Sequence, residues 1–508
     1  MIIFYCGKGC HLKASKNNTW KRNLLPVFGV LPLIIITGCI PQNTVTGYND
    51  VFITGGYVGV TNIYEGKDGK VDVDPDDLHE LIVAGKAFHD AGKWGKSSKV
   101  LELASQELNW KEDTIDTPEE AVRFVATTLT NDTLADYTGK IYEGVMLDYY
   151  QALNFLMLGD EAQARIHFNR LSERQSNAEI QLQSYTRTLK DTDTLPEDEK
   201  KRNIIVKSVE NTDINFERGR QNMPGNLKSA HIRSPSGDLM NALFRHTSSA
   251  RTDRKSRKVD KAIDAVQAKA PSAEARRFAG TLEKSFKKSK FDKAYILYED
   301  GYGPGISEFR VDLPLALVSE KILYSGIALP EFVSGRANNS NLEVKQGDKV
   351  QLTVGVTDLN RVASLEFDSA YDAKVGKEIT SAILKTVAQA AINHKIDEKN
   401  ANNPLAGLLL KAAVGIGQAL ITQADTRYWN NLPNEIQMAV LNKRSTESIE
   451  IIDASGVLLA TVPAIAGDQL IYVRQLMVGG DVKVFNLHLP AKTPATAVAT
   501  NRYITTQD

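Results

Sequence analysis

Cysteine is the residue type whose distribution says most about the chemistry open to this 508-residue chain. The three cysteines are Cys6, Cys10 and Cys39, and none follows between residues 40 and 508. A zinc cluster of the cysteine type, an iron–sulfur site and thiol catalysis all need cysteine thiolates. Such sites are therefore excluded from the long segment after Cys39, and that segment can hold no internal disulfide.

The surroundings of Cys39 predict a modified thiol. Residues 1–23 carry five cations and no acid, and residues 24–36 are almost wholly apolar. This apolar run is shorter than the roughly 20 residues of a membrane-spanning helix and is typical of a secretory signal. Ile36-Thr37-Gly38-Cys39 resembles a bacterial lipobox, which makes Cys39 the lipidated first residue of the mature protein. The alternative is an ordinary N-terminal anchor with an incidental cysteine.

The residue after Cys39 predicts where such a lipoprotein would go. Ile40 stands there, and the aspartate that retains bacterial lipoproteins in the inner membrane is missing. The lipobox therefore implies an outer-membrane protein on the periplasmic face. Several acyl chains together would anchor it stably, because a single chain binds a bilayer only marginally.

Two acidic or histidine-containing patterns were candidates for metal binding. Five aspartates lie between Asp68 and Asp77, but the sixth position of a calcium loop counted from Asp68 is Val73, where glycine is required. A solvated loop and a helix N-terminus are the favoured interpretation, with calcium as the alternative. His79-Glu80 begins like a zinc-protease helix, but Val83 stands where the second histidine belongs. We therefore expect no metal and no cofactor.

Other sequence patterns do not indicate an enzyme or a nucleic-acid-binding protein. The Gly-x-Ser-x-Gly elbow of serine hydrolases is missing, and the formal net charge is -1. A basic run between Arg245 and Lys258 could contact anionic lipid, an anionic polymer or an acidic protein, although a solvated helix or loop is favoured. It lacks the interleaved aromatic residues on which bases stack. We expect no nucleic-acid partner.

Asp425, Arg427 and Trp429 form the clearest candidate for a binding site. Tryptophan and arginine are frequent anchors of protein interfaces. Asp425 and Arg427 could instead cap and pair at a helix end, so a structural role is the alternative.

The helical pattern of residues 76–290 predicts the elements that would position such sites. Phe88 precedes Gly92 by four positions and Phe155 precedes Gly159 by four, with similar small and apolar residues around both. The two glycines are 67 positions apart, close to two tetratricopeptide periods of 34. Such repeats present a groove, so Phe88 and Phe155 are candidate partner-binding residues. An irregular helical bundle is the alternative.

From residue 291 onward, alternating apolar residues predict strands. The expected fold is a multidomain α+β chain in which a β-sandwich-like domain with an inserted helical hairpin follows the tetratricopeptide-like α-helical repeat domain. Within the hairpin, residues 405–421 are the most apolar stretch; packing against the partner helix is favoured over membrane contact. The expected parts are the signal peptide (1–38), a tether (39–75), the helical domain (76–290), the β-rich domain (291–370 and 445–490), the hairpin (371–430) and a loose tail (491–508).

Several short motifs together resemble one known family. They are YEDGYGP (298–304), FRVDLP (309–314), GIALP (326–330), ILKTVA (383–388), QADTRYW (423–429) and LP (432–433). As a set they are similar to an uncharacterised family of Gram-negative outer-membrane lipoproteins with tetratricopeptide-like helices. In that family the gene often lies beside that of a lipoprotein activator of a peptidoglycan synthase. The family has no established catalytic residues, so the resemblance implies none here.

These observations predict a non-catalytic, lipid-anchored scaffold or adaptor of the cell envelope with a protein partner, linked by the resemblance to peptidoglycan synthesis. One alternative is an envelope enzyme acting on peptidoglycan through carboxylates, because general acid–base pairs leave no sequence motif. Another is a glycan- or lipid-binding module that uses the apolar hairpin.

Overall fold

The computed structural model describes six main ranges, which are 44–113, 137–191, 215–287, 291–314, 324–399 and 424–501. Positions 226, 228–229, 255, 271, 339–340, 445 and 478 are gaps within them, and only scattered positions are described between 192 and 214. The signal peptide and Cys39 lie outside the described residues. The chain is mixed α and β, with a helical N-terminal region and a β-sheet C-terminal region, as the sequence predicts at that level.

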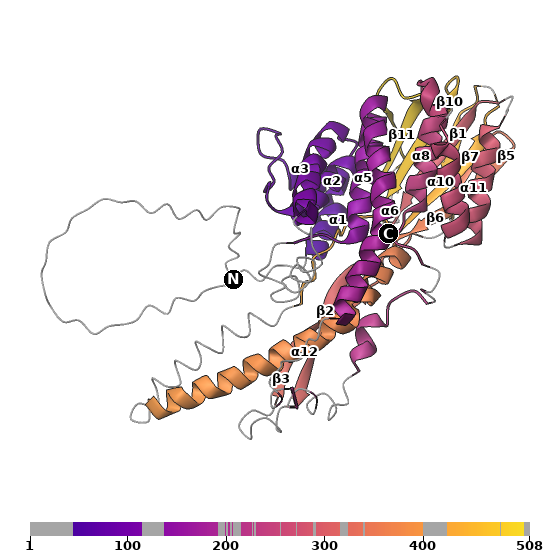
Figure 1. The fold of residues 1–508 in the computed structure, drawn as a ribbon. Helices are drawn as coiled ribbons and strands as arrows, with labels where there is room; N and C mark the ends of the chain where they lie inside the picture. Colours follow the sequence, from indigo (N-terminus) through magenta and orange to yellow (C-terminus); the bar gives the residue numbers. More distant parts are fainter. Residues whose placement is uncertain are drawn as a thin grey trace, which may run out of the picture. The chain divides into compact units, whose positions relative to one another are not determined.

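Two antiparallel helix pairs form the first part of the helical region (Figure 1). Each pair turns at a glycine with positive φ, 74° at Gly92 and 79° at Gly159. Only glycine adopts this conformation without strain, which explains why the two turns share that residue. The pairs are α2 (Leu78–Asp90) with α3 (Trp94–Asp113), and α5 (Ile141–Met157) with α6 (Glu161–Asp191).

Helix α1 (Thr44–Asn62) occupies much of the segment expected to be a tether. Its Phe52, Tyr57 and Val60 are at most 2% exposed and belong to the main hydrophobic core. The glycines of this segment suggested a loop, but they lie within a helix that is kinked at Gly56. Burial of large apolar side chains outweighs the low helix propensity of glycine here.

A second group of helices follows, of which α8 and α11 contact the sheet and η1 contacts strand β3 (Tyr324–Val333) (Figure 1). Their N-termini carry ordinary start signals, such as a proline in the first turn of α8 and Ser272 capping α11. The group comprises η1 (Phe216–Arg220), α8 (Pro235–Thr247), α9 (Arg251–Arg254), α10 (Lys258–Lys269) and α11 (Ala273–Phe286).

A six-stranded sheet forms the centre of the C-terminal region, in the order β12-β11-β10-β1-β7-β6. Strand β1 pairs parallel with β10 and antiparallel with β7. Both neighbours therefore come from a segment more than 130 residues further along the chain. The strands are β1 (Lys293–Asp300), β6 (Val354–Asp358), β7 (Glu435–Asn442), β10 (Asp468–Gln475), β11 (Val482–Leu489) and β12 (Thr496–Val498).

The two faces of this sheet contact different layers. Alternate residues of a strand point to opposite faces. Tyr295 and Leu297 belong to the core shared with the helices, whereas Ile296 and Tyr298 belong to the core shared with a four-stranded sheet. That second sheet has the order β5-β4-β8-β9, with β4 (Glu343–Gln346), β5 (Lys349–Leu352), β8 (Ile449–Ile452) and β9 (Leu458–Val462).

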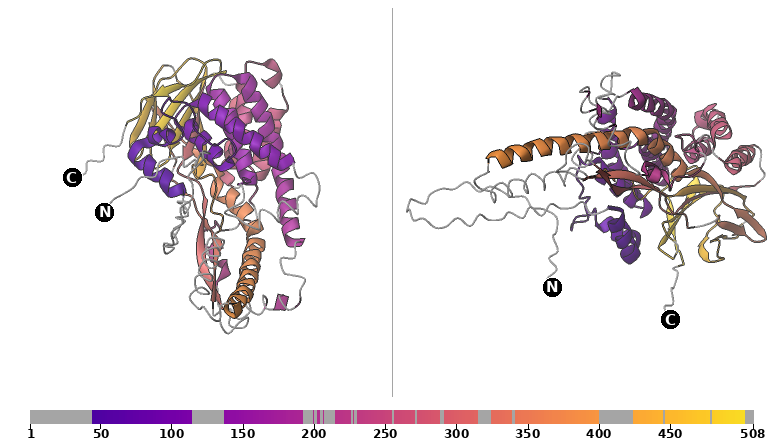
Figure 2. Two further views of the ribbon diagram at one scale, coloured as in Figure 1. Left: turned by 90° about the vertical axis from the view of Figure 1, so that its left-hand side faces the viewer. Right: turned by 90° about the horizontal axis from the view of Figure 1, so that it is seen from below.

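Helix α12 (Leu359–Lys399) lies beside the hairpin of β2 (Gly305–Pro314) and β3 (Tyr324–Val333), as Figures 1 and 2 show. The expected helical hairpin began at residue 371, whereas α12 begins at 359 because its first turns pack into the main core through Leu359 and Ala363. Residues 405–421 of that prediction lie outside the described residues. None of the described helices is long and apolar enough to span a bilayer.

Strand β7 is a second difference from the expected boundaries, which began the later β segment at residue 445. Five of its residues from Ile436 to Leu441 are buried without alternation. A central strand that is covered on both faces lacks the period of two that identifies a strand in sequence. In the segment expected to be a loose tail, residues 496–498 form β12 at the sheet edge.

Candidate functional site

Two of the three aromatic residues expected to bind a partner are core residues. Phe88 and Trp429 are both 0% exposed, and the Trp429 ring packs edge-on against Tyr150 with centroids 5.8 Å apart. Phe155 is half-buried and stacks on His167 at 5.2 Å. These interface assignments of Phe88 and Trp429 are therefore corrected, because a fully buried side chain cannot contact a partner in this structure.

The position of the helices on the sheet explains this burial. His89 in α2 bonds the Tyr472 hydroxyl of β10 through Nε2 at 3.1 Å. Trp94 at the start of α3 packs edge-on against Phe485 of β11, with centroids 4.8 Å apart. The chain's own sheet therefore covers part of α2 and the start of α3.

Asp425 and Arg427 form the structural pair that was the alternative interpretation. Arg427 donates to both carboxylate oxygens of Asp425, through Nε at 2.8 Å and an Nη at 3.0 Å. Burial works to raise the pKa of Asp425, but the hydrogen bonds from Arg427 and the charges of Lys140 and Arg427 outweigh it, so the pKa is lowered. The guanidinium also lies 5.5 Å from the centre of the Tyr137 ring. This pair braces the loop that leads to Trp429.

The metal candidates likewise have structural roles. The Asp77 side chain accepts the backbone N–H groups of His79 and Glu80, which makes it the N-cap of α2, in agreement with the helix-start interpretation. His79 Nε2 donates to the Tyr428 carbonyl at 2.8 Å. Among the residues that the structure describes, no group of three or more potential ligands is arranged to hold a metal ion.

The basic run from Arg245 to Lys258 is partly internal. Arg245 is 3% exposed and donates to the Asp253 carboxylate at 3.1 Å, while Arg254 donates to the Ser248 carbonyl. At least these two cations stabilise the turn after α8. The run is therefore not the uniformly solvated segment that the sequence favoured.

A buried cluster of four charges joins the helical layer to the sheet, and the sequence did not predict it. Lys86 and Asp90 of α2 and Glu299 and Arg474 of β1 and β10 are all 0% exposed. Lys86 Nζ contacts the carboxylates of Asp90 and Glu299, the latter at 3.0 Å, and Arg474 Nε lies 3.3 Å from Asp90. Two cations and two carboxylates balance, which is how charges are tolerated in an interior.

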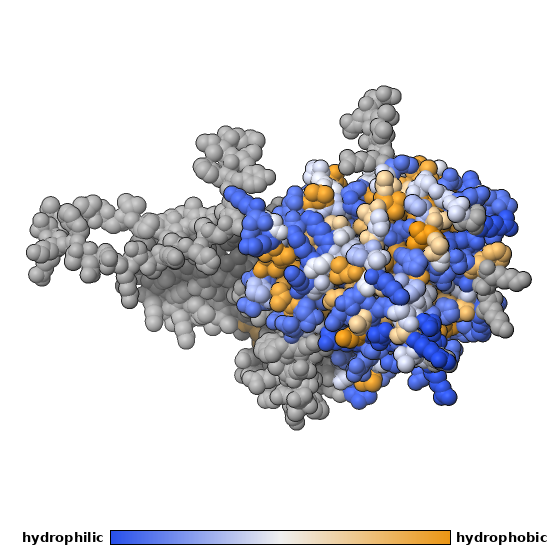
Figure 3. All heavy atoms as spheres, turned by 90° about the horizontal axis from the view of Figure 1, so that it is seen from above, coloured by the Kyte–Doolittle hydropathy of each residue, from blue (hydrophilic) through white to orange (hydrophobic). Residues whose placement is uncertain are grey.

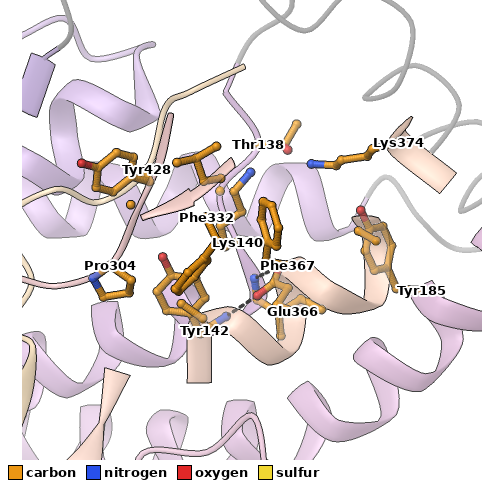
Figure 4. Close-up of a pocket in the computed structure, with 16 residues that line it drawn as sticks. Thr138, Lys140, Tyr142, Tyr185, Pro304, Phe332, Glu366, Phe367, Lys374 and Tyr428 are labelled. Carbon is orange, nitrogen blue, oxygen red and sulfur yellow. Dashed lines mark hydrogen bonds between the residues drawn. The ribbon is translucent and has the colours of Figure 1, made fainter. Parts of the chain in front are cut away.

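A pocket of about 140 Å³ opens where α5, α12, β2 and the loop before Trp429 meet (Figure 4). Its lining combines aromatic and aliphatic side chains with a small number of polar groups, the usual composition of a ligand site. The apolar part includes Tyr142, Ile306, Phe332, Phe367 and Tyr428. No predicted site residue lines it, although Tyr428 stands between Arg427 and Trp429.

Glu366 is the acid of this pocket, and both of its oxygens are engaged. They accept the backbone N–H groups of Ile141 and Tyr142 at 3.0 and 3.2 Å, so Glu366 caps the first turn of α5. Burial raises the pKa of Glu366, and the two N–H groups oppose this rise. A carboxylate held in this way stabilises the helix end, and each oxygen keeps a second acceptor site.

Two lysines supply the positive charge of the pocket. Lys140 precedes α5 and Lys374 is in α12, and both are half-buried. Figure 4 shows their side chains along the same side of the pocket, with Thr138 between them. No ion pair within 4 Å joins either ammonium group to another described residue, but Lys140 lies 5.5 Å from the centre of the Tyr137 ring and its charge works to lower the pKa of both Asp425 and Glu366. The pocket therefore combines an apolar interior with two cations available to an anion.

Comparison with known proteins supplies no family for this chain, because no family model, no curated protein and no solved structure matches it.

Proposed function

We propose that the chain is a non-catalytic scaffold or adaptor of the bacterial cell envelope, anchored in the outer membrane by lipid on Cys39 and facing the periplasm. In this proposal the paired helices are tetratricopeptide-like and the two facing sheets are sandwich-like. The lipobox motif supports the location. The resemblance of residues 298–433 to envelope lipoproteins supports a protein partner that acts in peptidoglycan synthesis.

The observation that carries the proposal is the pocket beside α5. Its acid, Glu366, serves as a helix cap, whereas its two lysines are left to interact with a ligand. Such a site is suited to binding a ligand that joins an apolar group to an anion. On the face shown in Figure 3, hydrophobic residues are scattered among hydrophilic ones, so no broad apolar surface there competes with the pocket as a docking site.

A comparison of Cys39→Ala with wild type in cells tests this proposal, and Cys10→Ala is the matched control. We expect wild type and Cys10→Ala to fractionate with the outer membrane and to incorporate a palmitate label. Cys39→Ala should lose both the label and the membrane association. After crosslinking, wild type should retain proteins of cell-wall synthesis. Unchanged fractionation of Cys39→Ala would refute the anchor, and the absence of a specific protein partner would refute the adaptor.

A further inference from the structure

The size of the pocket beside α5 limits what can enter it. Its volume of about 140 Å³ is close to that of an engineered cavity that holds one benzene molecule. One aromatic or branched aliphatic side chain fills this space, and any longer ligand would have to continue out of the open side of the pocket. Because Tyr142, Phe332 and Phe367 line the pocket, the apolar part of a ligand is the part that would be buried there.

The charges around the pocket place an anion at its edge. Glu366 is 8% exposed and adds negative charge in the interior, which disfavours a second carboxylate there. Lys140 and Lys374 are more exposed and lie on one side with Thr138, as Figure 4 shows. Two further acids lie nearby: Arg427 forms two hydrogen bonds with Asp425, whose pKa the charge of Lys140 also lowers, and Glu143 accepts the backbone N–H groups of Lys140 and Trp429. A ligand that fits has an apolar group inside and an anion beside the two lysines.

The carboxyl-terminal residue of a protein combines these two features within one residue, since its side chain and its carboxylate share one Cα atom. We propose that this pocket binds the C-terminus of a protein partner whose last residue is apolar. The terminal side chain fills the pocket, and the terminal carboxylate accepts hydrogen bonds from Lys140, Lys374 and Thr138. This assignment rests on the proposed adaptor function. It adds the chemistry of the partner, which is an apolar last residue with a free carboxylate.

Fluorescence anisotropy with a defined probe tests the assignment. The probe is a short Gly/Ser peptide that carries fluorescein at its N-terminus and ends in phenylalanine with a free carboxylate. The same peptide with a C-terminal amide is the comparison. We expect the acid to bind the full chain saturably and at least about tenfold more tightly than the amide, because only the acid forms charge-assisted hydrogen bonds.

Variants of the protein separate the two halves of the site. Lys140→Gln with Lys374→Gln should weaken binding of the acid about tenfold and leave the amide unaffected. Ile306→Trp, which fills the pocket from β2, should weaken both peptides. Lys345→Gln, on β4 outside the pocket lining, is the matched control and should change neither. Circular dichroism checks that each variant is folded.

Equal binding of the acid and the amide, or no saturable binding of either, would overturn the assignment. Laurate is the lipid probe for the same site. If laurate displaces the peptide from the wild-type chain and does so less well when Lys140 and Lys374 are replaced, the ligand is a lipid and the assignment is overturned. Co-purification separates this failure from failure of the adaptor function. If the doubly substituted chain still retains the wild-type partners after crosslinking, the adaptor stands and only the pocket assignment is wrong.

Discussion

Replacing Lys86 by methionine removes one cation from the buried cluster and keeps most of the side-chain volume. Asp90 and Glu299 would then share Arg474 alone, in a site where all four residues are 0% exposed. Removing one partner of a buried ion pair costs about 3–5 kcal/mol, because a charge is left uncompensated in the interior. The ammonium group also lies 4.6 Å from the centre of the Tyr150 ring, so this contact is lost as well. We expect the free energy of unfolding to fall by an amount in that range.

A double-mutant cycle measures whether charge balance is the cause. Glu299→Gln alone leaves two cations and one carboxylate, whereas Lys86→Met with Glu299→Gln leaves Asp90 paired with Arg474. The double variant should therefore be at least about 2 kcal/mol more stable than the sum of the single effects predicts. Urea unfolding of the full chain, followed by tryptophan fluorescence, gives these values.

The matched control for the cycle is Lys345→Met, which removes a surface ion pair with Glu450. The side chains of Lys345 and Glu450 are 42% and 41% exposed. This substitution should cost no more than about 1 kcal/mol. The reasoning is refuted if the single effects simply add, or if Lys86→Met costs as little as Lys345→Met.

Three further predictions concern single residues. Gly159→Ala should cost more stability in urea unfolding than Gly69→Ala, because both residues have positive φ but only at Gly159 would the new Cβ lie 2.8 Å from the backbone of Thr493. Burial, reinforced by neighbouring carboxylates, raises the pKa of Glu435 from 4.5 to about 7. The free energy of unfolding should therefore fall by up to about 3 kcal/mol as pH rises through this window. Glu435→Gln should abolish that pH dependence. Burial lowers the pKa of His89 from 6.5 to about 4, so stability should fall as pH drops from 6.5 toward 4, and His89→Gln should flatten that limb.

The signs of the two pH effects follow from proton binding. Between pH 4.5 and 7 the folded chain holds a proton on Glu435 that the unfolded chain has released, so rising pH favours unfolding. Between pH 6.5 and 4 the unfolded chain protonates His89 first, so falling pH favours unfolding. A variant with the wild-type slope would contradict the assignment for that residue, and equal costs for the two glycine substitutions would contradict the steric argument.

Local patterns predicted the elements whose signals are local. The turns at Gly92 and Gly159 need positive φ, and β8 to β11 alternate or lie between turn residues, so their positions could be read from the sequence. Strand β7 and the first turns of α12 could not, because their burial depends on layers contributed by distant segments. The same holds for α1, whose glycines suggested a loop.

The candidate site also depends on contacts between distant segments, which local sequence patterns do not reveal. Trp429 beside Arg427 has the composition of an interface anchor, but a sequence does not say which aromatic side chains the fold will cover. The pocket is assembled from residues 138–142, 304–306 and 363–374 with Tyr185, Phe332 and Tyr428. Pro304 and Tyr428 belong to the segments 298–304 and 423–429 that carry the family resemblance, but neither segment has a known ligand-binding pattern. The nearest sequence signal was the position of Tyr428 between Arg427 and Trp429, two of the residues predicted to bind a partner.

The pairing of β1 has a consequence for how the chain is made. Residues 293–300 find both of their strand neighbours only in residues 435–442 and 468–475. Until those residues have been synthesised, β1 has two unpaired edges, and the apolar faces of the helices that pack on the sheet stay exposed to solvent. Loop-closure entropy makes such long-range pairing slow, and unpaired edges invite aggregation. The helical region is therefore expected to depend on holdase chaperones until the last tenth of the chain emerges, and fragments that stop before β7 should be degraded rather than accumulate as independent folding units.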